Sequence, residues 1–332
     1  ETAVMTDRLS AAQWSRFWTK GSITTFIGRF ADNYDGKVRD FWLDVFGQLE
    51  RGARVVDLAT GNGGLALLAQ QYSRRHDRGF TITAVDYADI DPPRTFAQKP
   101  YASHLRRIRF LARTPLEATG LPRASIDAAI SQFGFEYGKP GPAVTEVDRI
   151  LKPNGAIFAA MVHEAGSVII AQARNGVEQI IACEKSGLHH HVTELLERLD
   201  RLQSRGKDAQ RDNRARELRA TINRVTEGLH DVADGFQDPS QIKFYLENTM
   251  RAFHPDITRR RTLTEKLDAL RGIAAETTAY RQRMRDLISS ARSPADISTL
   301  EAGLRKANFK IEISEPFVLE GKRFCHALIG KR

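Results

Sequence analysis

Short apolar runs alternate with helix-like segments through the first half of the chain. Five such runs are predicted as strands, at residues 54–58, 80–86, 108–112, 126–131 and 156–163. Strands that are apolar on both faces and separated by helices are typical of a parallel sheet covered by helices on both sides. The pattern therefore predicts an open α/β sheet.

From residue 164 to 292 the strand pattern stops and helical periodicity replaces it. Apolar residues recur at alternating spacings of four and three, first from Leu188 to Leu202 and again from Leu218 to Phe236. This narrow apolar seam indicates helices that pack at a shallow angle. The polar break at 204–213 favours an antiparallel helical hairpin. Two roles stay open for the seam: the core of a helical subdomain, or a coiled coil that forms a homodimer.

The α/β pattern resumes after Ser293. Ser293 and Pro294 are typical of a helix start, and strands are expected at 309–313 and 324–329 as an antiparallel hairpin. The prediction is thus a seven-stranded Rossmann-like sheet with a large all-helical insertion after its fifth strand. The expected parts are a helical flap at 1–34, the α/β domain at 35–163 and 293–332, and the insertion at 164–292.

The charge balance is basic, with 50 Lys+Arg against 41 Asp+Glu, a net charge of +9 and a pI near 9.7. Such a balance suggests nucleic acid as a partner. The excess is spread thinly, however, and only 106–109 and 259–261 are concentrated clusters. Cys183 and Cys325 are too few for a disulfide framework, and no apolar run is long enough for a membrane span. We expect a cytoplasmic protein without a membrane partner.

A glycine-rich run joins the first strand to the next helix, with Gly61 and Gly63 at its centre. Glycines let the backbone approach a ligand closely, and the helix behind them offers free N–H groups. The spacing to Ala66 also fits a loose dinucleotide pattern, which is a weak signal. Asp57, on the strand end, suits a ligand with a cationic ammonium group better than a pyrophosphate. Asp86 ends the second strand, where a carboxylate can accept both hydroxyls of a ribose.

Together these residues resemble the class I S-adenosylmethionine-dependent methyltransferases. The family's acidic-x-Gly-x-Gly-x-Gly pattern is matched at 57–63, with Ala59 in place of the first glycine. The run at 151–155 (LKPNG) is similar to the family's turn before the fifth strand, and 131–135 is similar to the loop after the fourth. The resemblance covers about 35–163 and 293–332 and implies S-adenosyl-L-methionine as the cofactor.

The resemblance also implies a set of cofactor-binding residues. Those expected around the methionine part are Asp57, Ala59, Gly61 and Gly63. Asp86 is expected to hold the ribose, with Tyr87 beside the adenine. The family often has an acid after the third strand; here Thr114 or a backbone carbonyl is the expected substitute. Gln132 and Phe133 are expected to face the sulfonium, and Tyr34 to touch the cofactor.

Catalytic candidates follow the fourth and fifth strands. His163 ends the fifth strand, at the sheet edge where open α/β folds place ligand chemistry, and Glu136 and Tyr137 lie beyond the loop of Gln132. No metal is expected, because consecutive histidines at 189–191 point about 100° apart on a helix.

Some methyl acceptors are disfavoured. The Asn/Asp-Pro-Pro-Tyr motif of adenine and glutamine methyltransferases is missing from the fourth loop, and neither cysteine lies there for cytosine C5 chemistry. We expect a small apolar or aromatic acceptor, methylated on O or N, with the insertion as a lid that contributes Phe244, Tyr245 and Phe253. The alternatives are a protein or RNA acceptor, and a scaffold that binds the cofactor without catalysis.

Overall fold

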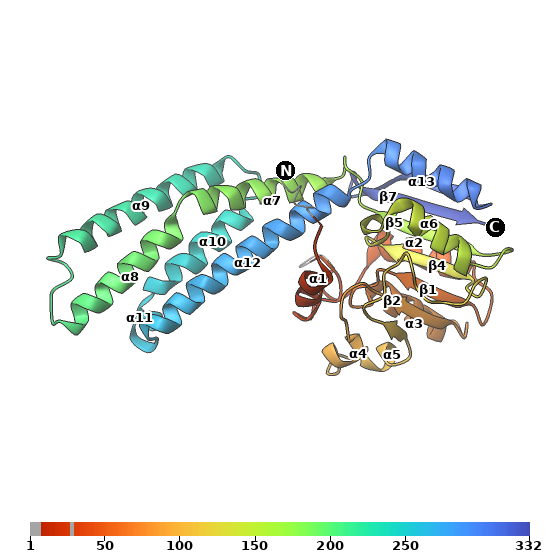
Figure 1. The fold of residues 1–332 in the computed structure, drawn as a ribbon, viewed down its shortest axis with the longest axis horizontal. Helices are drawn as coiled ribbons and strands as arrows, with labels where there is room; N and C mark the ends of the chain where they lie inside the picture. The colour runs from red at the N-terminus through yellow and green to blue at the C-terminus, as the bar shows by residue number, and fades with distance from the viewer. Residues whose placement is uncertain (1–7, 27–29) are drawn as a thin grey trace, which may run out of the picture. The chain divides into compact units, whose positions relative to one another are not determined.

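The computed structural model describes residues 8–26 and 30–332 (Figure 1). It divides into two compact units, an α/β unit made of 8–170 and 289–332 and a helical unit made of 171–288. The chain leaves the α/β unit and returns to it at one place, because Glu164 and Arg292 form a parallel β-bridge. The N-terminal segment from residue 8 belongs to the α/β unit.

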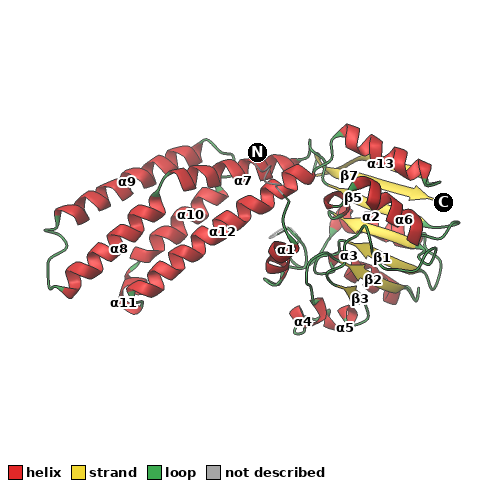
Figure 2. Cartoon of the chain, viewed as in Figure 1, coloured by secondary structure: helices red, strands yellow, loops and turns green. Residues whose placement is uncertain are grey.

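The α/β unit is built on one seven-stranded sheet of order β3-β2-β1-β4-β5-β7-β6 (Figure 2). Its strands are β1 (Arg54–Leu58), β2 (Thr81–Val85), β3 (Arg109–Leu111), β4 (Ala128–Gln132), β5 (Ile157–Val162), β6 (Lys310–Leu319) and β7 (Lys322–Lys331). The first five are parallel, and β7 runs antiparallel to both β5 and β6. The predicted fold, with its antiparallel C-terminal hairpin and its helical insertion after the fifth strand, is confirmed.

The strand register brings the predicted site residues to one edge of the sheet. Leu58 pairs with Val85, and Gln132 pairs with Met161. Parallel strands in register end together, so the residues that follow them share one edge. These residues are Ala59, Asp86, Phe133 and His163.

Helices cover both faces of the sheet (Figure 1). Helices α6 (Pro140–Ile150) and α13 (Pro294–Lys306) pack on each other and share an apolar core with the strands. Helices α2 (Gly36–Gly47) and α3 (Gly64–Arg75) pack together elsewhere on the sheet. The remaining short helices are α1 (Ala11–Trp18), α4 (Pro92–Thr95), α5 (Ala102–Leu105) and the 3₁₀ turn η1 (Phe135–Tyr137).

The helical unit contains helices and loops (Figure 2). Its elements are α7 (Val168–Lys185), α8 (Leu188–Ser204), α9 (Asn213–Asp234), α10 (Ser240–Met250), η2 (Arg251–Phe253), α11 (Pro255–Arg260) and α12 (Leu263–Ser290). Arg198 pairs with Asp212 at the loop, and Glu194 pairs with Arg214 one turn away, so α8 and α9 are antiparallel, as predicted for a helical hairpin. No helix in the described ranges combines the length and the apolarity that a membrane span needs.

Candidate active site

The loop after β1 takes left-handed backbone angles at three alternate residues. These are Ala59 (φ +54°), Gly61 (φ +56°) and Gly63 (φ +86°), and Gly63 is the N-cap of α3. A Cβ on Gly61 would lie 2.3 Å from the indole of Trp18, so only glycine allows so close an approach. The loop therefore presents bare backbone to a flat group, as a ligand cradle requires.

Two buried carboxylates flank this loop. Asp57 accepts hydrogen bonds from Thr60 Oγ1 (2.5 Å) and from the Ala66 N–H (3.0 Å). Asp86 accepts from the N–H groups of Gly61 (2.7 Å) and Ala88 (2.8 Å). Burial raises the pKa of Asp57 to about 7 and that of Asp86 to about 6.

Within the described ranges, neither carboxylate forms a salt bridge with lysine or arginine. Buried acids of this kind gain stability from a cationic ligand or from hydroxyl donors, since both favour the ionised form. S-adenosylmethionine carries an ammonium, a sulfonium and ribose hydroxyls. The residues present therefore fit that cofactor.

Three further predicted contacts have different outcomes in the structure. Tyr34 is buried, and the charges of Asp57 and Glu136 add to burial in raising its pKa, so its hydroxyl lies near the site. Thr114 lies beside the ribose acid, because its N–H donates to the Asp86 carbonyl (2.8 Å). Tyr87 directly follows Asp86 and its side chain is 54% exposed, and its place beside the adenine stays a prediction.

The end of β4 carries an unpaired donor. Gln132 Oε1 accepts from the Trp42 indole N–H, whereas its buried Nε2 has no hydrogen-bond partner within the described part of the chain. The next residue, Phe133, has φ +56° and stacks on His163 with ring centroids 4.3 Å apart. A buried amide donor without a partner is costly, so this donor favours a polar ligand at the strand end.

His163 and Glu136 form a buried pair. His163 Nδ1 lies 2.6 Å from Glu136 Oε1, and the same oxygen accepts the His163 backbone N–H at 2.8 Å. Both side chains are buried. The backbone carbonyls of Glu136 and Gly138 accept from the Arg292 guanidinium, which fixes the η1 turn that carries Glu136. The ring centroids of Tyr137 and His163 lie 6.4 Å apart, with the rings nearly perpendicular.

The structure adds residues that the sequence analysis did not assign to the site. Arg292 donates to the Glu136 carbonyl, and Asn62 donates to the Trp18 carbonyl at the end of α1. Phe110 lies against Gly63, and Gly134 lies against Ala59. Asn62 stands inside the motif and carries a side-chain amide, which is the one signal that could have identified it. The rest depend on long-range packing and leave no mark in the local sequence.

A sheet of this order, with the glycine loop after β1 and acids at the ends of β1 and β2, defines a class I S-adenosylmethionine-dependent methyltransferase domain. A family model described as "Methyltransferase domain" matches residues 56–159, inside the α/β unit. The α/β unit is therefore such a domain, of unspecified subfamily, and S-adenosylmethionine is its cofactor.

Similar solved structures include three proteins. Geranyl diphosphate C-methyltransferase from Streptomyces coelicolor A3(2) is 19% identical over 38% of this chain and 42% of that chain, with a TM-score of 0.31. A SAM dependent methyltransferase from Aquifex aeolicus is 21% identical over 38% and 64%, with a TM-score of 0.32. The [4+2]-cyclase SpnF is 19% identical over 47% and 61%, with a TM-score of 0.35. The chain covers less than two thirds of each of these proteins, and no curated protein matches it.

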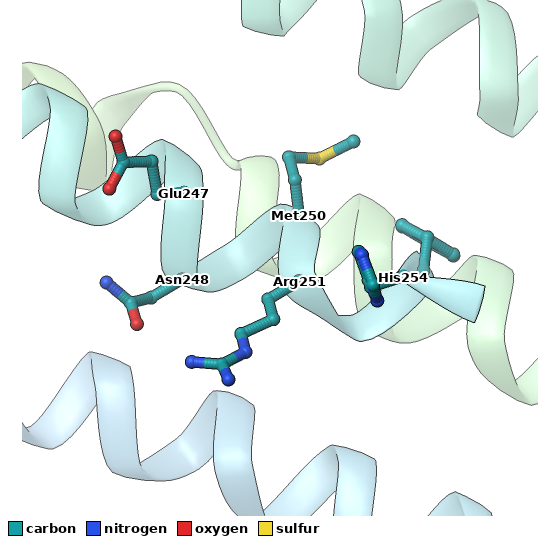
Figure 3. Close-up of a pocket in the computed structure, with 6 residues that line it drawn as sticks. Glu247, Asn248, Met250, Arg251 and His254 are labelled. Carbon is teal, nitrogen blue, oxygen red and sulfur yellow. The ribbon is translucent and has the colours of Figure 1, made fainter. Parts of the chain in front are cut away.

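The helical unit has a groove of its own, of about 590 Å³ (Figure 3). It is lined by Glu247, Asn248, Met250, Arg251, Phe253 and His254. Of the three aromatic residues predicted to line a pocket, Phe253 does so here, Tyr245 is buried in the helical core, and Phe244 is 44% exposed. The structure therefore does not bring these three side chains together in one pocket.

Proposed function

We propose that the protein transfers a methyl group from S-adenosylmethionine to an oxygen or nitrogen of a small apolar or aromatic acceptor. One observation carries this proposal: the buried His163–Glu136 pair lies at the carboxyl edge of the sheet, directly under the Phe133 ring. A buried histidine with a carboxylate beside its Nδ1 is suited to act as a general base.

The chain supplies position and a proton acceptor. When bound, the cofactor supplies an electrophilic methyl group on a sulfonium. Glu136 Oε1, 2.6 Å from His163 Nδ1, favours the tautomer with the proton on Nδ1 and leaves Nε2 to accept a proton. His163 Nε2 would take the proton of the acceptor's hydroxyl or ammonium, which leaves a free lone pair on that oxygen or nitrogen for the attack. Buried walls keep water away from this step.

The side chains around His163 favour one class of acceptor. The ring centroid of Phe133 lies 5.4 Å from that of Phe26 and 5.8 Å from that of Phe324. The Phe324 ring also contacts Phe30, with centroids 6.3 Å apart. Aromatic walls with one polar group favour a flat apolar acceptor with a single hydroxyl or amine. Phenols and apolar amines are therefore the first compounds to test.

The test is a labelled-methyl transfer assay with a panel of phenols and apolar amines. Loss of a general base lowers kcat by about 10²–10⁴-fold, so we expect His163→Ala to lower kcat in this range with little change in cofactor affinity. His76→Ala, which changes an exposed histidine of the same unit, is the matched control. Unchanged kcat in His163→Ala would refute the base. Labelling of protein or RNA alone would favour the macromolecular acceptor instead.

A further inference from the structure

Helix α1 lies against the glycine loop and the segment after β2, two places where cofactor-binding residues are expected. The indole of Trp18 rests on Gly61, close enough that a single Cβ there would overlap it. Phe17 and Trp18 form a buried cluster with Ala88 and Ile90, just beyond β2. The same cluster includes Trp14, Phe110 and Ala112, of which the last two lie on and just after β3.

Specific polar contacts hold α1 in this position. Asn62 Nδ2 donates to the backbone carbonyls of Trp18 and Ser22, each at 2.8 Å. The Asp89 N–H donates to Ser15 Oγ, also at 2.8 Å. One tether comes from the glycine loop and the other from the loop after β2, so both anchors belong to the cofactor site itself. Apolar packing and polar anchoring on the same surface indicate a defined docking position.

With α1 docked, the cofactor-binding groups are covered. Asp57 and Asp86 are 1% and 7% exposed, and Gly61 and Gly63 are buried. No part of the cofactor can lie against Gly61, or against Ala88 and Ile90, while the Trp18 indole holds that space. Two flat groups cannot share one surface, so docking of α1 and binding of adenosine exclude each other.

We propose that α1 (Ala11–Trp18) is an internal competitor of the cofactor, which binds only after this helix withdraws from the adenosine groove. The proposal rests on the proposed function through cofactor binding alone. A protein whose competent state is only partly populated has its apparent affinity lowered by that fraction. Weakening the docking of α1 therefore tightens cofactor binding, whereas removing a true cofactor contact weakens it.

The test measures binding of S-adenosylhomocysteine to the full chain by titration calorimetry. Trp18→Ala removes the competing ring, and Ser15→Ala removes only a tether. We expect about tenfold tighter binding for Trp18→Ala and a smaller gain in the same direction for Ser15→Ala. Ser298→Ala is the matched control, because Ser298 on α13 is exposed and donates, as Ser15 does, to the carbonyl four residues earlier. Its affinity should equal that of the wild type.

Tryptophan fluorescence gives a second readout on the unmodified protein. Trp42 donates its indole N–H to Gln132 at the site and can respond as well, so the change in the wild type is compared with that in Trp18→Ala, and the part lost in the variant reports Trp18. Withdrawal of α1 predicts a red shift and stronger quenching by acrylamide at saturation. Weaker or unchanged binding in both variants, or a blue shift, would overturn the proposal and make Trp18 a cofactor contact. Absence of binding in the wild type and in every variant would instead refute the proposed function.

Discussion

Ala59 holds a backbone conformation that a side chain disfavours. Its φ of +54° is left-handed, at the position where the resembling family has glycine. The left-handed region costs a residue with a Cβ about 1–2 kcal/mol. The chain therefore stores strain in the loop that cradles the cofactor, at a residue between the buried Asp57 and Gly61.

Replacing Ala59 by glycine should stabilise the protein. Relief of the left-handed strain outweighs the entropy that glycine adds to the unfolded chain, so we expect a gain of up to about 1 kcal/mol. Urea unfolding measures the change. Gly134→Ala is the opposite test, because its Cβ would lie 2.6 Å from the Ala59 Cβ and should destabilise by roughly 1–3 kcal/mol. An Ala59→Gly variant that is no more stable than the wild type would contradict the stored strain.

Cofactor affinity should depend on pH through Asp57 and Asp86. Burial raises their pKa values to about 7 and about 6, so each acid is protonated more readily in the folded chain than in the unfolded one. Their contribution to stability is thus present below about pH 4 and is lost as pH rises through 6 and 7. A cationic ligand needs the ionised forms and should bind more tightly as pH rises.

Calorimetry of S-adenosylmethionine binding between pH 5 and 8 measures this dependence. We expect affinity to rise with pH and to level off above about pH 7, with a slope of at most about tenfold per pH unit for each acid. Asp57→Asn should remove the upper part of the slope even if it weakens binding throughout. A flat profile in the wild type would show that neither acid changes ionisation on binding.

At the scale of elements, the sequence predicted the strands well because they are buried on both faces. β4 and β5 are buried at every position, which gives continuous apolar runs. β6 was predicted only to Ile313, yet it continues to Leu319 through Pro316. Proline is tolerated because β6 is an edge strand of the sheet, and a register shift between Phe317 and Val318 follows it.

The site was predicted less completely, for a physical reason. Asp57, Asp86 and the glycines lie in one local motif, so their residue types and spacing reveal them. The contact of His163 with Glu136 depends on how the loop after β4 folds back over the end of β5, which single-sequence patterns do not encode. The docking of Trp18 on Gly61 is also long-range: the aromatic spacing predicted a flap or core, not the surface it covers.

Asp212 joins the two helices of the α8–α9 hairpin and should matter for its stability. Its carboxylate caps α9 through the Ala215 N–H, and the Arg198 guanidinium lowers its pKa to about 2. That contribution is present above about pH 4 and is lost as pH falls towards 2.

Asp212→Ala should lower the melting temperature at pH 7 by more than Asp212→Asn. Asparagine retains the cap and loses only the ion pair, so it is the matched control. Thermal unfolding followed by circular dichroism measures both variants. Equal losses in the two would show that the cap contributes nothing, and no loss in either would show that the hairpin does not depend on this residue.

At the scale of the whole molecule, the two units should be separable. The chain departs and returns side by side in the α/β unit, since the Arg292 N–H donates to the His163 carbonyl (2.8 Å) and the Ala165 N–H donates to the Arg292 carbonyl (3.0 Å). Every predicted cofactor residue lies in that unit. Inserted domains joined at one neck are tolerated by their hosts because few contacts cross the junction.

We expect a variant in which a short Gly/Ser linker replaces residues 171–288 to fold and to bind S-adenosylhomocysteine within about threefold of the wild-type affinity. Adding Asp86→Ala to this variant should abolish the binding, which controls for its specificity. Failure to fold would mean that the helices complete the core of the sheet domain. Methyl transfer to the small acceptor separates the two roles of the insertion. Loss of this activity in the variant would support a lid that holds the acceptor. Full activity, together with a change from dimer to monomer in sedimentation, would assign the helices to self-association.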